Sequence, residues 1–328
     1  MNAASTTAIP QDTSPAAAYA FCREIARREA KNFYWAFRVL PRHKSDAMCA
    51  IYAFMRRADD ISDDESKSLQ ARRQEMTLWL AAWRATSLPD QAGSASGPAT
   101  TLLGATADVT VFRALRDTQR RFSIPDSLLE ELIAGTTMDL APQPGDANAV
   151  QTYATFEDLY RYGYLVASVV GLVSIRVFGY TDKRAEALAE ETGIAFQLTN
   201  ILRDVKEDIE RGRVYIPLDL MDEFGETIPE LRELAAGRAM TERERGMLAT
   251  LAIRAERYYV AGRKLVPLLD RDSRAAMWVL MAIYHRLLGR IGERRMDVFA
   301  ERITVPAATK LSILARGIVM AAWNRIVP

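Results

Sequence analysis

Acidic side chains that recur at helical spacing constrain the fold of this chain most. In the first fifth of the sequence, four residues fall at positions i, i+4, i+7 and i+11, and so on one face of an α-helix: Tyr52, Arg56, Asp59 and Asp63. Like charges at this spacing destabilise a helix by roughly 0.2–0.5 kcal/mol per pair. The pattern therefore predicts a helix whose acidic face is neutralised by a cation.

The same geometry recurs well beyond the middle of the chain, in Gln197, Asn200, Asp204, Asp208 and Arg211. Oxygen ligands without a neighbouring His or Cys favour a hard ion, and Mg²⁺ binds through one or two carboxylates together with substrate phosphates and water. We therefore predict a magnesium site for diphosphate, with Mn²⁺ as a substitute ion. The predicted metal ligands are Asp59, Asp60, Asp63, Asn200, Asp204 and Asp208.

A single acidic run has simpler explanations. Charged residues near a helix end are usually solvated. A calcium-binding loop is disfavoured because the segment that begins at Asp59 lacks Gly at its sixth position and Glu at its twelfth. Two acidic faces on separate helices are harder to explain as solvated surfaces, and they favour the metal site.

Apolar residues also recur at helical spacing along most of the chain, for example Ala47, Ile51 and Phe54. No comparable strand-like alternation and no internal repeat occur, and 328 residues with 49% hydrophobic content can bury one large core. We predict an all-α protein with a loose tail at 1–14 and one domain at 15–328. Helices are expected near 15–36, 43–62, 68–86, 100–121, 126–139, 155–178, 182–208, 240–266, 271–292 and 306–325.

Composition excludes several classes of function. Lys and Arg total 43 against 42 Asp and Glu, a formal charge of +1, so no nucleic-acid footprint is indicated. The two cysteines, Cys22 and Cys49, give no disulfide framework or zinc spacing and suit a reducing cytosol. The two histidines are too isolated for a His-based metal centre. Nothing in the sequence indicates an oligomeric state.

Membrane insertion is not expected. Residues 1–14 lack the basic start and apolar block of a signal peptide, and the longest uncharged run, Tyr162 to Ile175, is shorter than the ~20 apolar residues that cross a bilayer. We expect a cytoplasmic protein in which this run is a buried helix. Residues 311–323 either pack as the last core helix or make a peripheral contact with the inner face of the membrane.

Several further residues could bind a diphosphate and an attached apolar chain. Pairing between helices is the alternative for each of four arginines that could neutralise phosphate: Arg56, Arg203, Arg211 and Arg213. Small residues between aromatic ones would let an apolar chain lie against the backbone, with core packing as the alternative, on the stripe Tyr160, Tyr164, Ala167 and Gly171.

Three segments together resemble the squalene/phytoene synthase family of head-to-head prenyl synthases. They are YAFMRRADDISD at 52–63, YGYLVASVVG at 162–171 and GIAFQLTNILRD at 193–204, followed by Asp208. The resemblance covers residues 17–312. It implies a single-domain isoprenoid-synthase-type helical bundle around a central cavity, with a squalene/phytoene synthase-like catalytic domain from residue 15 onward.

The resemblance also implies roles for individual residues. Asp59 and Asp63 would bind Mg²⁺ on one wall of the cavity, and Asn200, Asp204 and Asp208 on the other. Catalytic roles are implied for Arg56, Asp59, Asp63, Tyr162, Asp204 and Asp208. The resemblance implies substrate contacts for Phe33, Arg56, Tyr162, Gln197, Tyr284 and Arg302. From the residues themselves we add as predicted substrate contacts Lys31, Asn32, Ala167, Gly171, Asn200, Arg203, Arg211 and Arg213. The chain departs from the family's pattern at Lys31, Asn32, Ser168 and Met296.

The activity implied is prenyl transfer, as a Mg²⁺-dependent head-to-head condensation of two prenyl diphosphates. Residues 32–41 resemble bacterial presqualene diphosphate synthases, so farnesyl diphosphate is the expected substrate. The product would be presqualene diphosphate or a squalene-type lipid for hopanoid, sterol or carotenoid synthesis, and NADPH would be needed only for reduced squalene. The alternatives are phytoene synthesis from geranylgeranyl diphosphate, a class I terpene cyclase, and a catalytically silent assembly or interaction protein.

Overall fold

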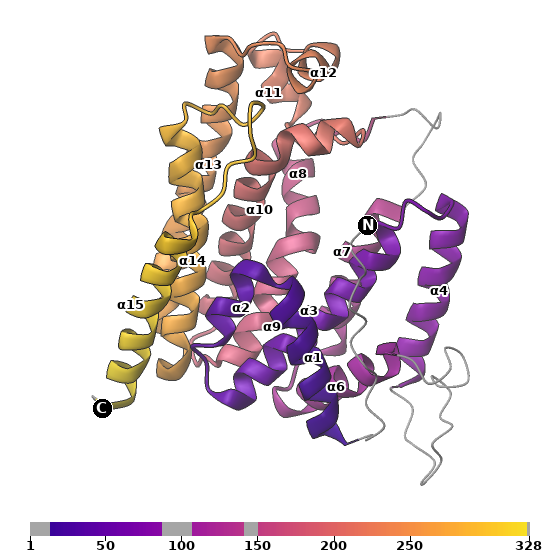
Figure 1. Cartoon of the computed structure of the whole chain (residues 1–328), viewed down its shortest axis with the longest axis vertical. Coiled ribbons are helices and arrows are strands. Elements are labelled where there is room, and N and C mark those ends of the chain that lie inside the picture. Colours follow the sequence, from indigo (N-terminus) through magenta and orange to yellow (C-terminus); the bar gives the residue numbers. More distant parts are fainter. Residues whose placement is uncertain (1–13, 87–106, 141–149, 327–328) are drawn as a thin grey trace. The chain divides into compact units, whose positions relative to one another are not determined.

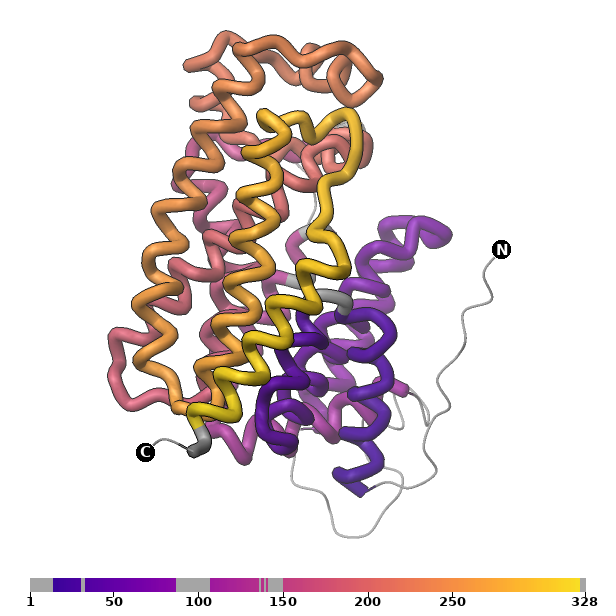
Figure 2. The backbone as a smooth tube through the Cα atoms, turned by 60° about the vertical axis from the view of Figure 1, so that its left-hand side comes forward, coloured from indigo at the N-terminus to yellow at the C-terminus, as the bar shows by residue number. Residues whose placement is uncertain are grey.

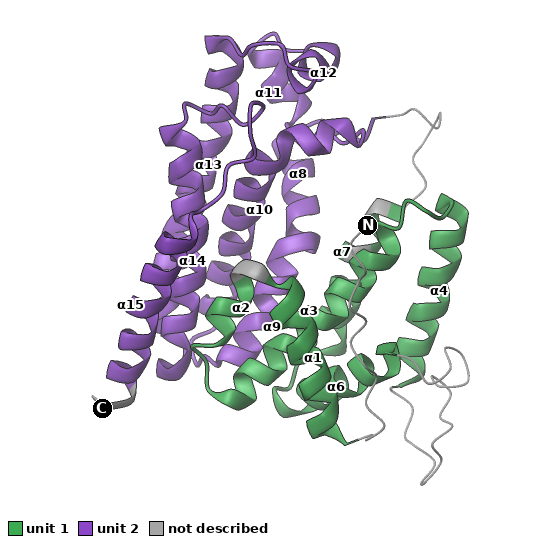
Figure 3. Cartoon of the chain, in the orientation of Figure 1, with its two compact units in different colours: residues 1–141 green, residues 142–328 purple. Residues whose placement is uncertain are grey.

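The computed structural model describes residues 14–86, 107–140 and 150–326, without the side chains of Lys31, Asn32, Thr136, Asp139, Arg325 and Ile326. Within these ranges every regular element is a helix, and the only β pairing is two isolated bridges (Figure 1). The all-α prediction is confirmed. The helices form two compact units, residues 1–141 and 142–328, and each is described by itself (Figure 3). The assignment of residues 15–328 to one domain stays a prediction.

The first unit is organised by an aromatic core. Phe54 packs against Trp79 and Trp83 with ring centroids 4.7 and 5.0 Å apart, and Phe112 closes the cluster at 5.2 Å from Trp79. These buried rings fix one face of α3 against α4 and α6, which leaves its acidic face outward. The elements are α1 Pro15–Glu29, α2 Lys31–Phe37, α3 Arg42–Ser62, α4 Leu69–Ala85, α6 Ala107–Arg121, α7 Asp126–Thr137 and the 3₁₀ turn η1 Met138–Leu140.

The single helix expected at 15–36 is wrong, because the structure divides it into α1 and α2 at Ala30. The backbone of Ala30, with φ −75° and ψ 0°, leaves the helical region and ends α1. No Gly or Pro marks this break in the sequence, so periodicity alone does not detect it.

The second unit is built around α10. Its elements are α8 Phe156–Gly163, the π-helical turn η2 Tyr164–Ser168, α9 Val169–Phe178, α10 Arg184–Glu210, α11 Leu218–Glu223, α12 Ile228–Ala235, α13 Glu242–Leu265, the 3₁₀ turn η3 Val266–Leu268, α14 Arg271–Glu293 and α15 Ala307–Ile326. A Cβ on Gly193 of α10 would lie only 2.5 Å from Cα of Ser168. Gly193 therefore permits a backbone contact between α10 and η2 that a larger residue would prevent.

The continuous helical stretch Phe156–Phe178 contradicts the expectation that no segment is long enough to cross a bilayer. By length and composition alone it is, although 44% of its most apolar window is buried within the protein. The sequence estimate counted only the uncharged run between Arg161 and Arg176, whereas the helix extends beyond both. A core helix of a soluble protein meets the same criterion.

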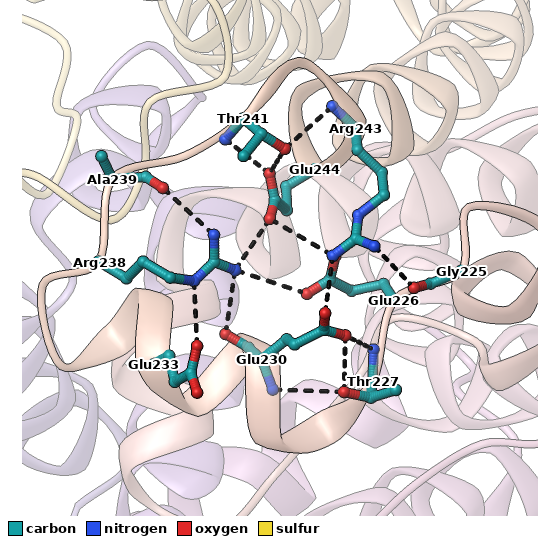
Figure 4. Close-up of polar contacts among 10 residues, drawn as sticks. All are labelled: Gly225, Glu226, Thr227, Glu230, Glu233, Arg238, Ala239, Thr241, Arg243 and Glu244. Atoms are coloured by element: carbon teal, nitrogen blue, oxygen red, sulfur yellow. Dashed lines mark hydrogen bonds and ion pairs between the residues drawn. The ribbon is translucent and has the colours of Figure 1, made fainter.

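An ion-pair cluster with two buried carboxylates lies at the corner formed by α11, α12 and α13 (Figure 4). Arg238 contacts Glu244 at 2.8 Å, and Arg243 contacts both Glu226 and Glu230 at 2.9 Å. The side chains of Glu226 and Glu244 are fully buried. The sequence analysis missed α11 and α12, although a capping box between Thr227 and Glu230 begins α12.

Candidate active site

The first acidic motif lies at the C-terminal end of α3. Asp59 and Asp63 are exposed and lie one turn apart, and Asp63 is the residue that ends the helix. Asp60 points to basic partners instead, with Arg56 at 2.8 Å and Arg57 at 3.6 Å. The metal roles predicted for Asp59, Asp60 and Asp63 stay predictions.

Arg57, which was not among the predicted site residues, anchors this end of α3. Its Nε lies 2.7 Å from Asp108 on α6, whose side chain is largely buried. Nε of Arg56 is buried and has no hydrogen-bond partner within the described part of the chain. Arg56 therefore keeps donor capacity beside the acidic face, as a diphosphate contact requires.

Three residues at the start of the predicted site lie on α2. Phe33 packs near Phe37, with ring centroids 6.4 Å apart. The side chains of Lys31 and Asn32 lie outside the described residues, so their predicted phosphate contacts stay predictions.

The second acidic motif lies along α10, where Asp204 is held by two arginines. Arg203 donates from Nε to Oδ1 of Asp204 at 2.8 Å, and Arg302 donates from Nη2 to the same oxygen at 2.6 Å. Arg302 also lies 3.6 Å from Glu207. The structure thus brings together three predicted residues from two distant parts of the sequence.

Asn200 presents a buried oxygen on the same helix. Its side chain hydrogen-bonds Tyr284 of α14, while its Oδ1 is buried without a hydrogen-bond partner among the described residues. The amide nitrogen must therefore be the donor to Tyr284. Tyr284 is fixed by stacking on Phe196, with centroids 4.5 Å apart. A buried amide oxygen left open in this way is suited to accept a hard cation.

Asp208, one turn beyond Asp204, has an altered acidity. Burial raises its pKa to about 7, and the charge of Asp204 acts in the same direction, while Arg213 and Arg211 oppose it. Burial and the neighbouring carboxylate both disfavour the charged form of Asp208. A cation bound beside the two carboxylates would favour the charged form.

The end of α10 is fixed by the segment that follows it. Gly212 adopts φ +74°, a left-handed cap, as the predicted helix end at 211–217 requires. Gln151 pairs with this segment on both sides, donating to the carbonyl of Gly212 at 2.9 Å and accepting from Val214 at 2.8 Å. Arg213 is thereby held beside Asp208.

Tyr162 lies in a buried tyrosine cluster that the sequence analysis did not identify. Its hydroxyl donates to Tyr215 at 3.1 Å, and its ring lies 5.3 Å from that of Tyr153. Tyr215 also lines a narrow crevice with Asp208 and Arg213. Since these tyrosines come from segments far apart in sequence, helical periodicity gave no signal for them.

The predicted cavity helix packs closely on α10. The hydroxyl of Ser168 donates to the carbonyl of Glu190 at 2.7 Å, and a Cβ on Gly171 would lie 3.0 Å from the carbonyl oxygen of Ala189. Core packing, the alternative reading, therefore accounts for these two positions. Gln197 lines a small apolar pocket between α8 and α10. Substrate contacts of Ala167, Gly171 and Gln197 stay predictions.

The fold and these residues define an all-helical protein with acidic, arginine-bearing helix faces. The squalene/phytoene synthase family profile matches residues 26–309, and the chain belongs to this family. It is a prenyltransferase of the type that joins prenyl diphosphates head to head, and the family uses a divalent metal to bind diphosphate.

Individual relatives agree with this assignment. The chain is 33% identical over 304 residues to a phytoene synthase of Mycobacterium tuberculosis, covering 91% of this chain and 89% of the relative. It is also 33% identical over 311 residues to a 15-cis-phytoene synthase of Synechococcus elongatus, covering 90% and 91%. The structure resembles a ligand-bound dehydrosqualene synthase with a TM-score of 0.75 and 26% identity, covering 94% of this chain and 98% of the other.

Proposed function

We propose that this protein condenses two geranylgeranyl diphosphates head to head in the presence of Mg²⁺. The α10 face carries the proposal, because Asn200 offers an unpaired buried oxygen beside Asp204 and Asp208. The relatives named phytoene synthase favour the longer substrate, which was the alternative in the sequence analysis, over farnesyl diphosphate. Likeness to a dehydrosqualene synthase keeps farnesyl diphosphate as the second candidate.

The donor set on each unit fits a hard cation. Asp59 and Asp63 would hold Mg²⁺ on α3, and Asn200, Asp204 and Asp208 would hold it on α10. When bound, the metal neutralises diphosphate charge and stabilises the leaving group. The raised pKa of Asp208 and the open oxygen of Asn200 are the observations in support.

The chain's own side chains supply the rest of the electrostatics. Arg203 and Arg302 already converge on Asp204, so both lie where a phosphate oxygen would need donors. Arg56 offers a donor beside the acidic face of α3, because its buried Nε has no hydrogen-bond partner among the described residues. These positioned charges would favour departure of diphosphate from the first substrate.

The reaction proposed is an electrophilic alkylation. Diphosphate leaves the first substrate, the double bond of the second attacks the resulting allylic carbon, and loss of a proton closes a cyclopropane ring. A second loss of diphosphate, with rearrangement and loss of a second proton, gives a neutral linear product of the phytoene type. Apolar side chains around the prenyl chains would keep water from the cation.

Product analysis tests this proposal. Purified protein is incubated with Mg²⁺ and geranylgeranyl or farnesyl diphosphate, separately and together, with and without NADPH. A phytoene-length lipid with diphosphate release is expected. A product made from two farnesyl units would contradict the proposed substrate chain length but agree with head-to-head condensation. A product from a single substrate molecule would indicate a cyclase. Absence of diphosphate release would indicate a silent protein.

A further inference from the structure

One helix displays apolar side chains on two faces. On the inner face of α15, Leu314, Gly317 and Ala321 are buried, and a Cβ on Gly317 would meet Val279 of α14 at 2.3 Å. Figures 1 and 2 show α14 and α15 side by side along this contact. The packing alternative for the C-terminal segment is therefore correct for this face.

The outer face of α15 is apolar as well. Leu311 is 54% exposed, Ile318 53%, Val319 68% and Trp323 66%. Their spacing, i, i+7, i+8 and i+12, puts them on one side of the helix. Other large apolar side chains exposed in the described part of the chain occur in pairs on α4 and α13, so this stripe is the most extended of them.

The charges on α15 have one sign. The helix carries Lys310, Arg316 and Arg325 and has no Asp or Glu in its sequence. The guanidinium of Arg316 lies 5.4 Å from the ring of Trp278, which holds a cation beside the apolar stripe. An apolar stripe with Arg316 at its flank and an exposed tryptophan is complementary to the surface of an anionic bilayer.

We propose that the outer face of α15 docks on anionic lipid, with its apolar side chains among the acyl chains and Arg316 at the headgroups. A face that met a second protein copy would place like charges of two α15 helices near each other, which disfavours that occupant. The docking does not depend on the proposed reaction, since it concerns only this helix and the bilayer.

Vesicle sedimentation of the full chain tests the proposal. Wild-type protein should bind vesicles that contain phosphatidylglycerol, bind pure phosphatidylcholine more weakly, and lose binding at high salt. The double variant V319S/W323S should bind at least about tenfold more weakly, because it replaces two apolar side chains that would enter the acyl chains by polar ones. The matched control is Ile253→Ser, which changes a 55% exposed side chain on α13 and should bind like wild type.

Three outcomes would overturn it. They are failure of wild type to bind anionic vesicles, equal binding by V319S/W323S, and an equal loss in Ile253→Ser. A dimer that V319S/W323S dissociates, without vesicle binding, would assign the face to a second copy instead. Circular dichroism checks folding, and Leu311→Ser repeats the test at the other end of the stripe if the double variant unfolds.

Discussion

Arg302 and Arg203 both donate to Oδ1 of Asp204, at 2.6 and 2.8 Å. A carboxylate expected to hold a metal ion is thus neutralised by two guanidinium groups, one from its own helix and one from the segment before α15. Any cation that binds Asp204 must share it with these arginines or displace them towards the diphosphate.

Replacement of Arg302 by Gln should lower kcat/KM by roughly ten- to a hundredfold, the loss expected for one charge-assisted hydrogen bond to phosphate. Stability should change little, since the Arg302 side chain is 53% exposed. Steady-state kinetics and thermal melting measure the two effects. Arg294→Gln is the control, because Arg294 is similarly exposed and pairs with Glu301. Equal kinetics in both variants would contradict the phosphate role.

Asp204→Ala should abolish turnover and leave helix content unchanged. The substitution removes a predicted ligand but also relieves repulsion with Asp208. Diphosphate release and circular dichroism are the measurements, with Glu210→Ala on the exposed end of the same helix as a control that stays active. EDTA should stop wild-type turnover and Mg²⁺ should restore it. Turnover that persists in EDTA would be incompatible with the metal site.

Stability should depend on pH through the cluster of Figure 4. Burial alone would raise the pKa of Glu244, but hydrogen bonds from Thr241 and Arg238 outweigh it and lower the pKa to about 2. Ionised Glu244 therefore stabilises the fold above pH ~4.5, and this contribution, on the order of 3 kcal/mol, is lost as pH falls towards 2. The difference in the free energy of unfolding between wild type and Glu244→Gln should shrink as pH falls from ~4.5 towards 2.

The variant Glu226→Gln should show the opposite pH dependence of stability relative to wild type. Burial, the largest cause, raises the pKa of Glu226. The free energy of unfolding of wild type should therefore fall relative to that of this variant as pH rises above the unfolded-state pKa of ~4.3. Urea unfolding at several pH values gives both free-energy differences. Parallel pH dependence in the two variants would show that the two carboxyl groups are not distinguished as described.

Gly193→Ala should destabilise the protein by about 1–3 kcal/mol, because the added methyl group would meet the backbone of Ser168. Gly292→Ala is the matched helical control, since nothing lies within 4 Å of the position of its Cβ, and it should be neutral or slightly stabilising. Thermal unfolding measures both. If the two variants melt alike, the close approach of α10 to η2 is absent in solution.

Gly171→Leu would place a larger side chain on the predicted cavity helix, but that side chain would press on the carbonyl of Ala189. Loss of all activity in that variant would report on packing instead of chain length. The intermediate exposure of Ala167 makes it the better position for a selectivity test.

Long amphipathic helices could be predicted from sequence because burial on one face repeats with the helical period. The break at Ala30 could not be predicted, because no Gly or Pro stands there to end a helix. The helices α11 and α12 were missed because they are too short for a periodic signal. The oxygen ligands and arginines of α10 were predicted because they share one helix. Tyr153 and Tyr215 were missed because their contact with Tyr162 exists only after folding.

The π turn at Tyr164–Ser168 changes how the whole stretch from Phe156 to Phe178 is read. It inserts one residue into the helical repeat, so side chains after it point about 100° away from where a uniform helix would aim them. The stripe drawn through Tyr160, Tyr164, Ala167 and Gly171 is therefore not straight. Deleting a single residue within the turn would restore the uniform helical repeat and leave the side chains of α9 facing as they do now, because the turn takes up its extra residue locally.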